Sequence, residues 1–218
     1  NKPWLTRPSR RSKVFAVIDM TEIQPSAAAG FRVERRTPPE RLDVLSREIL
    51  QLKDDLNAVI LAHNYQTPEI FHCVSDIVGD SLQLAREATL VDAEIIVQCG
   101  VHFMAETADL LSRPEQAVIL PNLAAGCSMA DMASIDEVEQ AWEELADIYG
   151  DLDTPDAEGL LPVIPVTYMN SSAAIKGFVG RHHGIVCTSS NARTVLEWAF
   201  ERGRRVLFFP DQHLGRNT

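Results

Sequence analysis

The sequence predicts an α/β protein built from two similar three-layer α/β domains, each with a small parallel sheet. Three observations lead to this fold class. Short apolar segments of strand length recur along the chain, helical segments separate them, and a polar cluster follows each apolar segment. Short strands that alternate with helices are typical of parallel sheets covered on both faces.

Residues 1–40 are expected to form an irregular N-terminal extension. Five prolines interrupt them, and residues 1–13 contain five basic and no acidic side chains. Prolines at this density interrupt both helices and strands. A basic targeting arm is the alternative interpretation, but the segment has neither the apolar core of a signal peptide nor a clean amphipathic helix.

The first α/β domain is expected over residues 41–126. A helix over 40–53 opens it, because apolar residues such as Leu42, Leu45 and Ile49 recur there with helical spacing. The predicted strands that follow are 58–62, 94–98 and 117–120, and the predicted helices are 68–87 and 104–111.

The second α/β domain is expected over residues 127–218. Its first part, residues 131–159, is rich in Asp and Glu, contains no Lys or Arg, and includes a predicted helix over 135–149. The predicted strands are 162–167, 184–186 and 205–209, and a further helix is predicted over 193–202. The large aromatic residues expected in the core are Trp142, Trp198, Phe208 and Phe209.

Two sets of three strands suggest an internal duplication. In each set the last two strands end 22 residues apart, at Gln98 and Leu120 and at Cys187 and Phe209. One matching interval is weak evidence for a repeat. The duplication is therefore a hypothesis about how the two domains are related.

Composition excludes several function classes. The 218 residues are 45% apolar and 23% charged, which is typical of a globular protein with a substantial core. The net charge of −11 argues against nucleic-acid binding, because Lys and Arg hold phosphate backbones. No apolar run approaches the ~18–20 residues that span a bilayer, so we expect no membrane association.

The four cysteines lack the spacing of a disulfide framework and of C-x-x-C zinc motifs, which predicts reduced thiols in the cytoplasm. Cys73 falls on the apolar stripe of a predicted helix and is interpreted as structural. Cys99 and Cys187 end strands and are ambiguous. Cys127 lies between Gly126 and Ser128, where a thiolate would have backbone donors and room for a cofactor. The alternative, a small buried apolar residue, is favoured by the residues alone.

The polar clusters after the strands are the candidate site, because ligands of open α/β sheets bind beyond the carboxyl ends of the strands. His63-Asn64-Tyr65-Gln66 is the strongest cluster, since helix capping does not explain four consecutive hydrogen-bonding side chains. Ser189, Ser190 and Asn191 form a second cluster, but any of them could simply cap the following helix.

An anionic substrate suits these clusters. Ser171, Ser172, Ser189 and Ser190 offer hydroxyl donors, and helix N-termini add backbone N–H groups with a positive partial charge. Gly79-Asp80-Ser81 is expected to break a helical run and present Ser81. Walker and dinucleotide fingerprints are absent from the sequence, which disfavours nucleotide hydrolysis and nicotinamide chemistry.

Adjacent His182 and His183 form the remaining candidate for metal binding. A solvated loop within Gly180-Arg181-His182-His183-Gly184 is the interpretation that we favour for this pair. Two neighbouring histidines without a third ligand are a weak metal signal.

Taken together, the clusters resemble the quinolinate synthase family from about residue 40 to residue 218. The motifs occur in this order: His63-Asn64-Tyr65-Gln66, Gly79-Asp80-Ser81-Leu82, Gly100-Val101-His102-Phe103-Met104-Ala105-Glu106-Thr107-Ala108, Gly126-Cys127-Ser128-Met129-Ala130-Asp131, Tyr168-Met169-Asn170-Ser171-Ser172-Ala173, Cys187-Thr188-Ser189-Ser190-Asn191-Ala192 and Pro210-Asp211-Gln212-His213-Leu214-Gly215-Arg216-Asn217. Seven ordered motifs are far more specific than any single short motif.

The resemblance implies a fold and a reaction. The family condenses iminoaspartate (iminosuccinate) with dihydroxyacetone phosphate to quinolinate, on the de novo route to NAD. Its fold has three similar α/β domains around a pseudo-threefold axis, with the active site at their junction. A [4Fe-4S] cluster held by three cysteines, one from each domain, acts there as a Lewis acid. The enzyme that supplies iminoaspartate is a possible protein partner.

The motifs also imply roles for individual residues. Cys127 corresponds to the first cluster ligand, which reverses the preference stated above, whereas Cys73, Cys99 and Cys187 match no ligand position. His63 and Tyr65 are implied in substrate contact and acid–base steps. The residues implied in substrate binding are His63, Ser81, Tyr168, Met169, Asn170 and Ser189.

The chain departs from the family pattern in one large respect. The second and third cysteines of the family would fall after Thr218, so the chain corresponds to the N-terminal two domains of three. One thiolate cannot hold such a cluster, and we expect these residues alone to be inactive and to expose apolar surface. The alternative is a non-catalytic module that binds a small phosphorylated or dicarboxylic acid.

Overall fold

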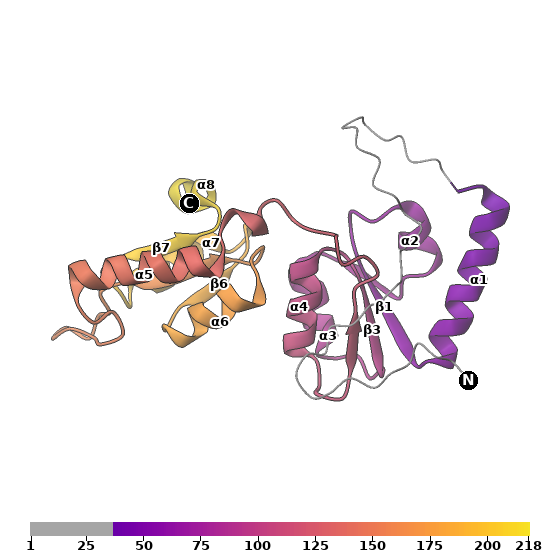
Figure 1. Ribbon diagram of the computed structural model, residues 1–218, viewed down its shortest axis with the longest axis horizontal. Helices are drawn as coiled ribbons and strands as arrows, with labels where there is room; N and C mark the ends of the chain where they lie inside the picture. The colour runs from indigo at the N-terminus through magenta and orange to yellow at the C-terminus, as the bar shows by residue number, and fades with distance from the viewer. Residues whose placement is uncertain (1–36) are drawn as a thin grey trace.

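The computed structural model describes residues 37–218 and is an α/β structure with two small parallel sheets, as predicted (Figure 1). Residues 1–36 of the expected extension lie outside the described residues. We call α1 through β4 the first half and α5 through α8 the second half. Figure 1 shows the two halves side by side, joined by the segment between β4 and α5.

The first half contains four parallel strands in the order β2-β1-β3-β4. Leu61 and Ile96 of the central strands are buried against Leu84 and Phe103 of α3 and α4, which form the core on one face. The elements are α1 (Pro39–Asp55), β1 (Ala58–His63), α2 (Pro68–Cys73), β2 (Ile77–Gly79), α3 (Ser81–Ala88), β3 (Ile95–Cys99), α4 (His102–Leu111) and β4 (Ala117–Ile119).

The second half contains three parallel strands in the order β6-β5-β7. Trp142 of α5 and Phe178 of α6 are buried on one face of this sheet, and Val195 and Ala199 of α7 on the other. The elements are α5 (Ile135–Tyr149), β5 (Ile164–Tyr168), α6 (Ala173–Arg181), β6 (Ile185–Cys187), α7 (Ala192–Phe200), β7 (Val206–Phe209) and α8 (Gln212–Asn217), and the 3-10 helix η1 (Ala130–Met132) lies in the joining segment.

The helix predicted over residues 68–87 is wrong, because this segment forms α2, β2 and α3. Asp76 explains the extra strand. Its backbone N–H donates to the Ile60 carbonyl at 3.0 Å, and its carboxylate accepts the Ile60 N–H at 2.8 Å. These bonds hold the β-branched pair Ile77-Val78 beside β1. The predicted break at Gly79-Asp80-Ser81 is the end of β2 and the start of α3.

The extra strand also changes the duplication hypothesis. β1 and β5 are the central strands that come first in each half, and β2 and β6 follow on one side, with β3 and β7 on the other. The equivalent strands are therefore β1-β2-β3 and β5-β6-β7, and β4 is an addition. The matching interval of 22 residues joined strands that are not equivalent, so it was a coincidence.

Smaller corrections concern side-chain environments. Cys73, predicted on a buried stripe, is exposed at the end of α2, because the helix ends there. His182, predicted in a solvated loop, packs against Trp142 and Phe178, and its Nδ1 lies 3.0 Å from the Asp153 carboxylate. The last motif, which follows β7, forms the short helix α8.

The aromatic residues expected in the core are in or against it: Trp142 and Phe209 are buried, and Trp198 and Phe208 pack as partly buried residues. Over residues 37–218, no helix has both the length and the apolar character needed to cross a membrane.

Candidate functional site

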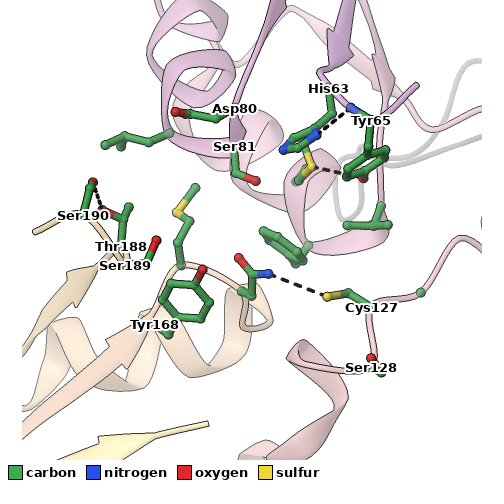
Figure 2. Close-up of a pocket in the computed structure, with 17 residues that line it drawn as sticks. His63, Tyr65, Asp80, Ser81, Cys127, Ser128, Tyr168, Thr188, Ser189 and Ser190 are labelled. Carbon is green, nitrogen blue, oxygen red and sulfur yellow. Dashed lines mark hydrogen bonds between the residues drawn. The ribbon is translucent and has the colours of Figure 1, made fainter. Parts of the chain in front are cut away.

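A cavity of about 620 Å³ lies between the two halves, at the carboxyl ends of β1, β2, β5 and β6 (Figure 2). It brings together every site residue that the motifs implied. The lining residues are His63, Tyr65, Asp80, Ser81, Leu82, Val101, Phe103, Met104, Gly126, Cys127, Ser128, Tyr168, Met169, Asn170, Thr188, Ser189 and Ser190. Parallel strands place the loops at their carboxyl ends on one edge, which explains the convergence.

His63 and Tyr65 follow β1 and contact one another, with ring centroids 4.0 Å apart. The Tyr65 backbone N–H donates to His63 Nδ1 at 3.3 Å, so a neutral His63 has its proton on Nε2. Burial lowers the pKa of His63, and Asp80 opposes this effect. Burial raises the pKa of Tyr65, and Cys127 raises it further. At neutral pH both side chains are therefore uncharged hydrogen-bond donors.

Ser81 is the first residue of α3, at the helix N-terminus that faces the cavity. Asp80 is the N-cap residue, and its carboxylate accepts the Gln83 backbone N–H at 2.8 Å. The cap fixes where the helix begins. The Ser81 hydroxyl therefore lies next to the positive end of the helix, where an anion is favoured.

Tyr168, Met169 and Asn170 belong to the loop after β5. Ser171 fixes this loop, because its fully buried hydroxyl donates to the Tyr168 carbonyl at 2.8 Å and accepts from Thr167 Oγ1 at 3.0 Å. The Met169 backbone N–H donates to the Cys187 carbonyl at 2.7 Å, which ties the loop to β6. This geometry directs the Asn170 amide toward Cys127 (Figure 2).

Ser189 lies in the turn between β6 and α7, with Thr188 and Ser190 beside it. Asn191 occupies the N-cap position of α7, but its side chain accepts from the Thr188 backbone N–H at 2.6 Å and from Thr188 Oγ1 at 3.0 Å. The turn therefore stabilises itself, and the capping interpretation does not account for Ser189, which lines the cavity.

Cys127 lies on the segment that joins the halves, and its Sγ is 3.7 Å from Asn170 Nδ2. The other three cysteines are elsewhere. Cys73 is exposed on α2, Cys99 lies on the opposite face of the first sheet, and Cys187 is buried in the second half. Burial raises the pKa of Cys99 and of Cys187 to about 11, so both remain thiols at neutral pH.

An iron–sulfur cluster therefore finds one ligand among the described residues. Thiolates hold [4Fe-4S] clusters, and Cys127 is the single cysteine that lines the cavity. Over residues 37–218 no three His, Cys, Asp or Glu side chains are grouped to hold a metal ion. Cys127 has the chemistry and the access that a ligand needs, but this part of the chain does not complete the site.

Some lining residues were not singled out for a role from the sequence. Asp80 acts on the His63 pKa, and the Tyr65 hydroxyl lies 3.7 Å from Met104 Sδ. Phe103 forms part of the cavity wall. Asp80, Phe103 and Met104 all lie in the quoted motifs, and Asp80 directly precedes Ser81, which was assigned a role. Their position in the motifs was the one feature of the sequence that could have identified them as site residues.

Comparison with known proteins agrees with the motifs. Residues 47–218 match the family described as quinolinate synthetase A protein. The chain is 69% identical over 179 residues to the quinolinate synthase of Corynebacterium glutamicum, covering 81% of this chain and 43% of the relative. It is 52% identical over 197 residues to that of Rhodopirellula baltica, covering 85% and 46%. The chain thus spans less than half the length of these relatives, and it belongs to the quinolinate synthetase A family.

Proposed function

We propose that this chain is the N-terminal part of a quinolinate synthase, which condenses iminoaspartate with dihydroxyacetone phosphate to quinolinate on the route to NAD. One observation carries the proposal. The eight side chains implied by the motifs come from both halves, and all line one cavity: His63, Tyr65, Ser81, Cys127, Tyr168, Met169, Asn170 and Ser189. We propose the domain boundaries 41–126 and 127–218, with a third domain in the intact enzyme.

The uncharged donors suit the condensation. Both substrates carry carbonyl-type or imine groups and anionic groups, and the reaction releases water. We expect His63 Nε2–H and the Tyr65 hydroxyl to donate hydrogen bonds to a departing hydroxyl or to a developing oxyanion. The Asn170 amide and the Tyr168 hydroxyl add donors from the second half.

Anionic groups are expected to bind without a basic side chain. Among the lining residues, all of which lie in the described part of the chain, there is no Lys or Arg. Ser81 at the α3 N-terminus and Ser189 in the β6–α7 turn supply hydroxyl and backbone donors instead. Carboxylate and phosphate groups are both suited to such donors.

Cys127 is proposed as the first ligand of a [4Fe-4S] cluster. When bound, such a cluster supplies an iron with an open position that polarises substrate oxygen and nitrogen atoms. The remaining ligands would come from the part of the enzyme that the relatives possess beyond this match. A cytoplasmic enzyme is proposed, with the iminoaspartate-forming enzyme as its partner and with neither nucleic acid nor membrane involved.

The test uses the protein from its complete reading frame, purified without oxygen. We expect a brown protein that forms quinolinate from the two substrates, and a Cys127→Ala variant that is colourless and inactive. A colourless, inactive parent protein with adequate iron supply would contradict the proposal.

A non-catalytic binding module is the second candidate, favoured by the presence of a single cavity cysteine beside intact anion donors. The reading frame separates the two candidates. A continuation with two more suitably placed cysteines supports the enzyme. A natural stop after residue 218, together with tight binding of phosphate or succinate in calorimetry, supports the module.

A further inference from the structure

A carboxylate from the first half caps a helix of the second half. Glu106 Oε2, on α4, accepts the backbone N–H of Ala173 at 3.0 Å. Ala173 is the first residue of α6, where backbone N–H groups have no partner within the helix and carry a positive partial charge. Glu106 therefore does for α6 what an N-cap residue does within one chain segment, but it does so across the boundary between the halves.

Lys176, one turn further along α6, makes a second contact at the same place. Its Nζ donates to the Ser171 carbonyl at 2.5 Å and lies 5.1 Å from the centroid of the Phe103 ring, on α4. Burial lowers the pKa of Lys176 to about 8, and the charge of Glu106 opposes that effect. Glu106 and Lys176 thus both bond to the backbone of residues 171–173.

The two contacts hold both ends of one short segment. The Ser171 carbonyl and the Ala173 N–H flank Ser172, directly after the loop that carries Tyr168 and Asn170. Phe103, which Lys176 contacts, is itself part of the cavity wall. A shift of α6 relative to α4 would therefore move the donors of the second half away from Cys127 and His63.

We propose that Glu106 and Lys176 form a clasp that sets the distance between the two halves of the site, and that they are positioning residues for substrate binding. Neither residue lines the cavity. Their effect is exerted through the loop 168–172 and through Phe103. The effect on turnover rests on the proposed function, whereas the effect on the loop does not.

Hydrogen exchange tests the clasp without reference to activity. The variants are Glu106→Ala, Glu106→Gln and Lys176→Met in the protein from its complete reading frame. A hydrogen bond to a charged group contributes enough that its loss is expected to open the segment about tenfold more often. We expect faster exchange in a peptide that covers residues 168–176, with Glu106→Gln intermediate because its amide oxygen still accepts the Ala173 N–H.

Lys53→Met is the matched control. Lys53 is also shielded from solvent, and its Nζ lies 2.5 Å from Asp76 Oδ1, but the pair joins α1 to the segment before β2. We expect this variant to speed exchange near α1 and to leave residues 168–176 unchanged. Unchanged exchange in 168–176 for both Glu106→Ala and Lys176→Met would overturn the clasp.

Steady-state kinetics test the positioning role in the same proteins. We expect Lys176→Met and Glu106→Ala to raise KM about tenfold with a smaller change in kcat, since the acid–base groups remain in place. Glu106→Gln is expected to be intermediate, and Lys53→Met to keep the parent KM. An inactive parent protein with a loosened loop in the variants would contradict the proposed function and support the clasp. An active parent whose KM is unchanged in both clasp variants would overturn the positioning role.

Discussion

The two halves share a strand order but differ in how their sheets are covered. The second sheet has buried apolar residues on both faces. Among residues 37–218, α3 and α4 cover one face of the first sheet, while an apolar groove of about 340 Å³ lies on the other. Helix α1 borders the groove yet buries none of its own residues. Equal topology therefore does not ensure equal burial.

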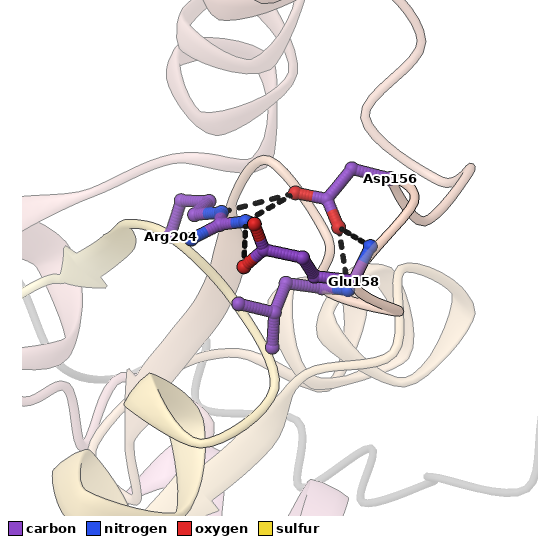
Figure 3. A network of polar contacts seen from close by, with 4 residues as sticks. Asp156, Glu158 and Arg204 are labelled. Carbon is purple, nitrogen blue, oxygen red and sulfur yellow. Dashed lines mark hydrogen bonds and ion pairs between the residues drawn. The ribbon is translucent and has the colours of Figure 1, made fainter.

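Each half also has ion pairs that link segments outside its sheet. In the second half, Arg204 donates to Asp156 at 2.8 Å and to Glu158 at 2.7 Å, which holds the acidic loop before β5 (Figure 3). In the first half, an ion pair between Lys53 and Asp76 links α1 to the segment before β2. Within the described part of the chain, the second half is closed by its own side chains, whereas the first half exposes the apolar groove.

The two halves also contribute different kinds of side chain to the cavity. The first half supplies the titratable pair His63 and Tyr65, and the second half supplies neutral donors such as Asn170 and Ser189. We infer that the first half carries the proton transfers, and that Ser81 of the first half shares binding with the donors of the second half. The predictions below test this division and the difference in coverage.

The largest effect is expected for His63→Ala in the complete enzyme. Loss of a general acid–base group reduces kcat by about 10²–10⁴-fold. His72→Ala is the matched control, because His72 is exposed on α2 and does not line the cavity. Quinolinate formation measures both variants, and a fall in kcat of less than threefold for His63→Ala would contradict the division.

Phe178→Ala tests the closed core of the second half. Phe178 is 2% exposed on α6, and truncating a buried phenylalanine costs about 3–5 kcal/mol of unfolding free energy. Phe200→Ala, at a side chain 57% exposed, is expected to change it by less than about 0.5 kcal/mol. Urea titrations measure both, and equal effects would show that the second core is not closed as described.

Ser189→Ala is expected to act on binding alone. One lost hydrogen bond of about 1–1.5 kcal/mol predicts a rise in KM of roughly tenfold with kcat nearly unchanged. Ser112→Ala provides the control, because the Ser112 hydroxyl donates to the Asp109 carbonyl at the end of α4. A large fall in kcat with constant KM would instead place Ser189 in the chemical step.

Self-association tests the open face of the first half. The 218-residue chain is expected to associate through its apolar groove, and Leu52→Glu places a charge there that weakens association several-fold or more. Sedimentation at two concentrations measures the change. A compact, well-behaved monomer for the unaltered chain would show that the groove does not drive association.

The last prediction concerns the pH dependence of stability that comes from Lys176. Its pKa is about 8 in the folded protein against an ordinary 10.5, so between these values the folded state binds fewer protons than the unfolded state. Stability from this group therefore rises with pH from about 8 to 10.5. Tyr65 and the buried thiols also titrate at alkaline pH. Subtracting the unfolding free energy of Lys176→Met from that of the parent therefore isolates the contribution of Lys176. A difference that is constant with pH would contradict it.

Periodicity predicted much of the fold, because strongly apolar strands and capped helices are local features. Helix α5 is an example, since a capping box between Ser134 and Glu137 fixes its start in the sequence itself. Strand β2 was missed for the opposite reason. Its three residues resemble a helix in the local pattern, and only the Asp76 bonds to β1 decide the outcome.

The fold class and the family could be read from the sequence, which also predicted the site residues, because ordered motifs encode chemistry residue by residue. Contacts between distant segments settled which strands are equivalent, where an apolar groove lies among residues 37–218, and how Glu106 and Lys176 join the halves. These features depend on contacts between residues far apart in the chain. Local propensity carries no information about such contacts until the sheets have formed.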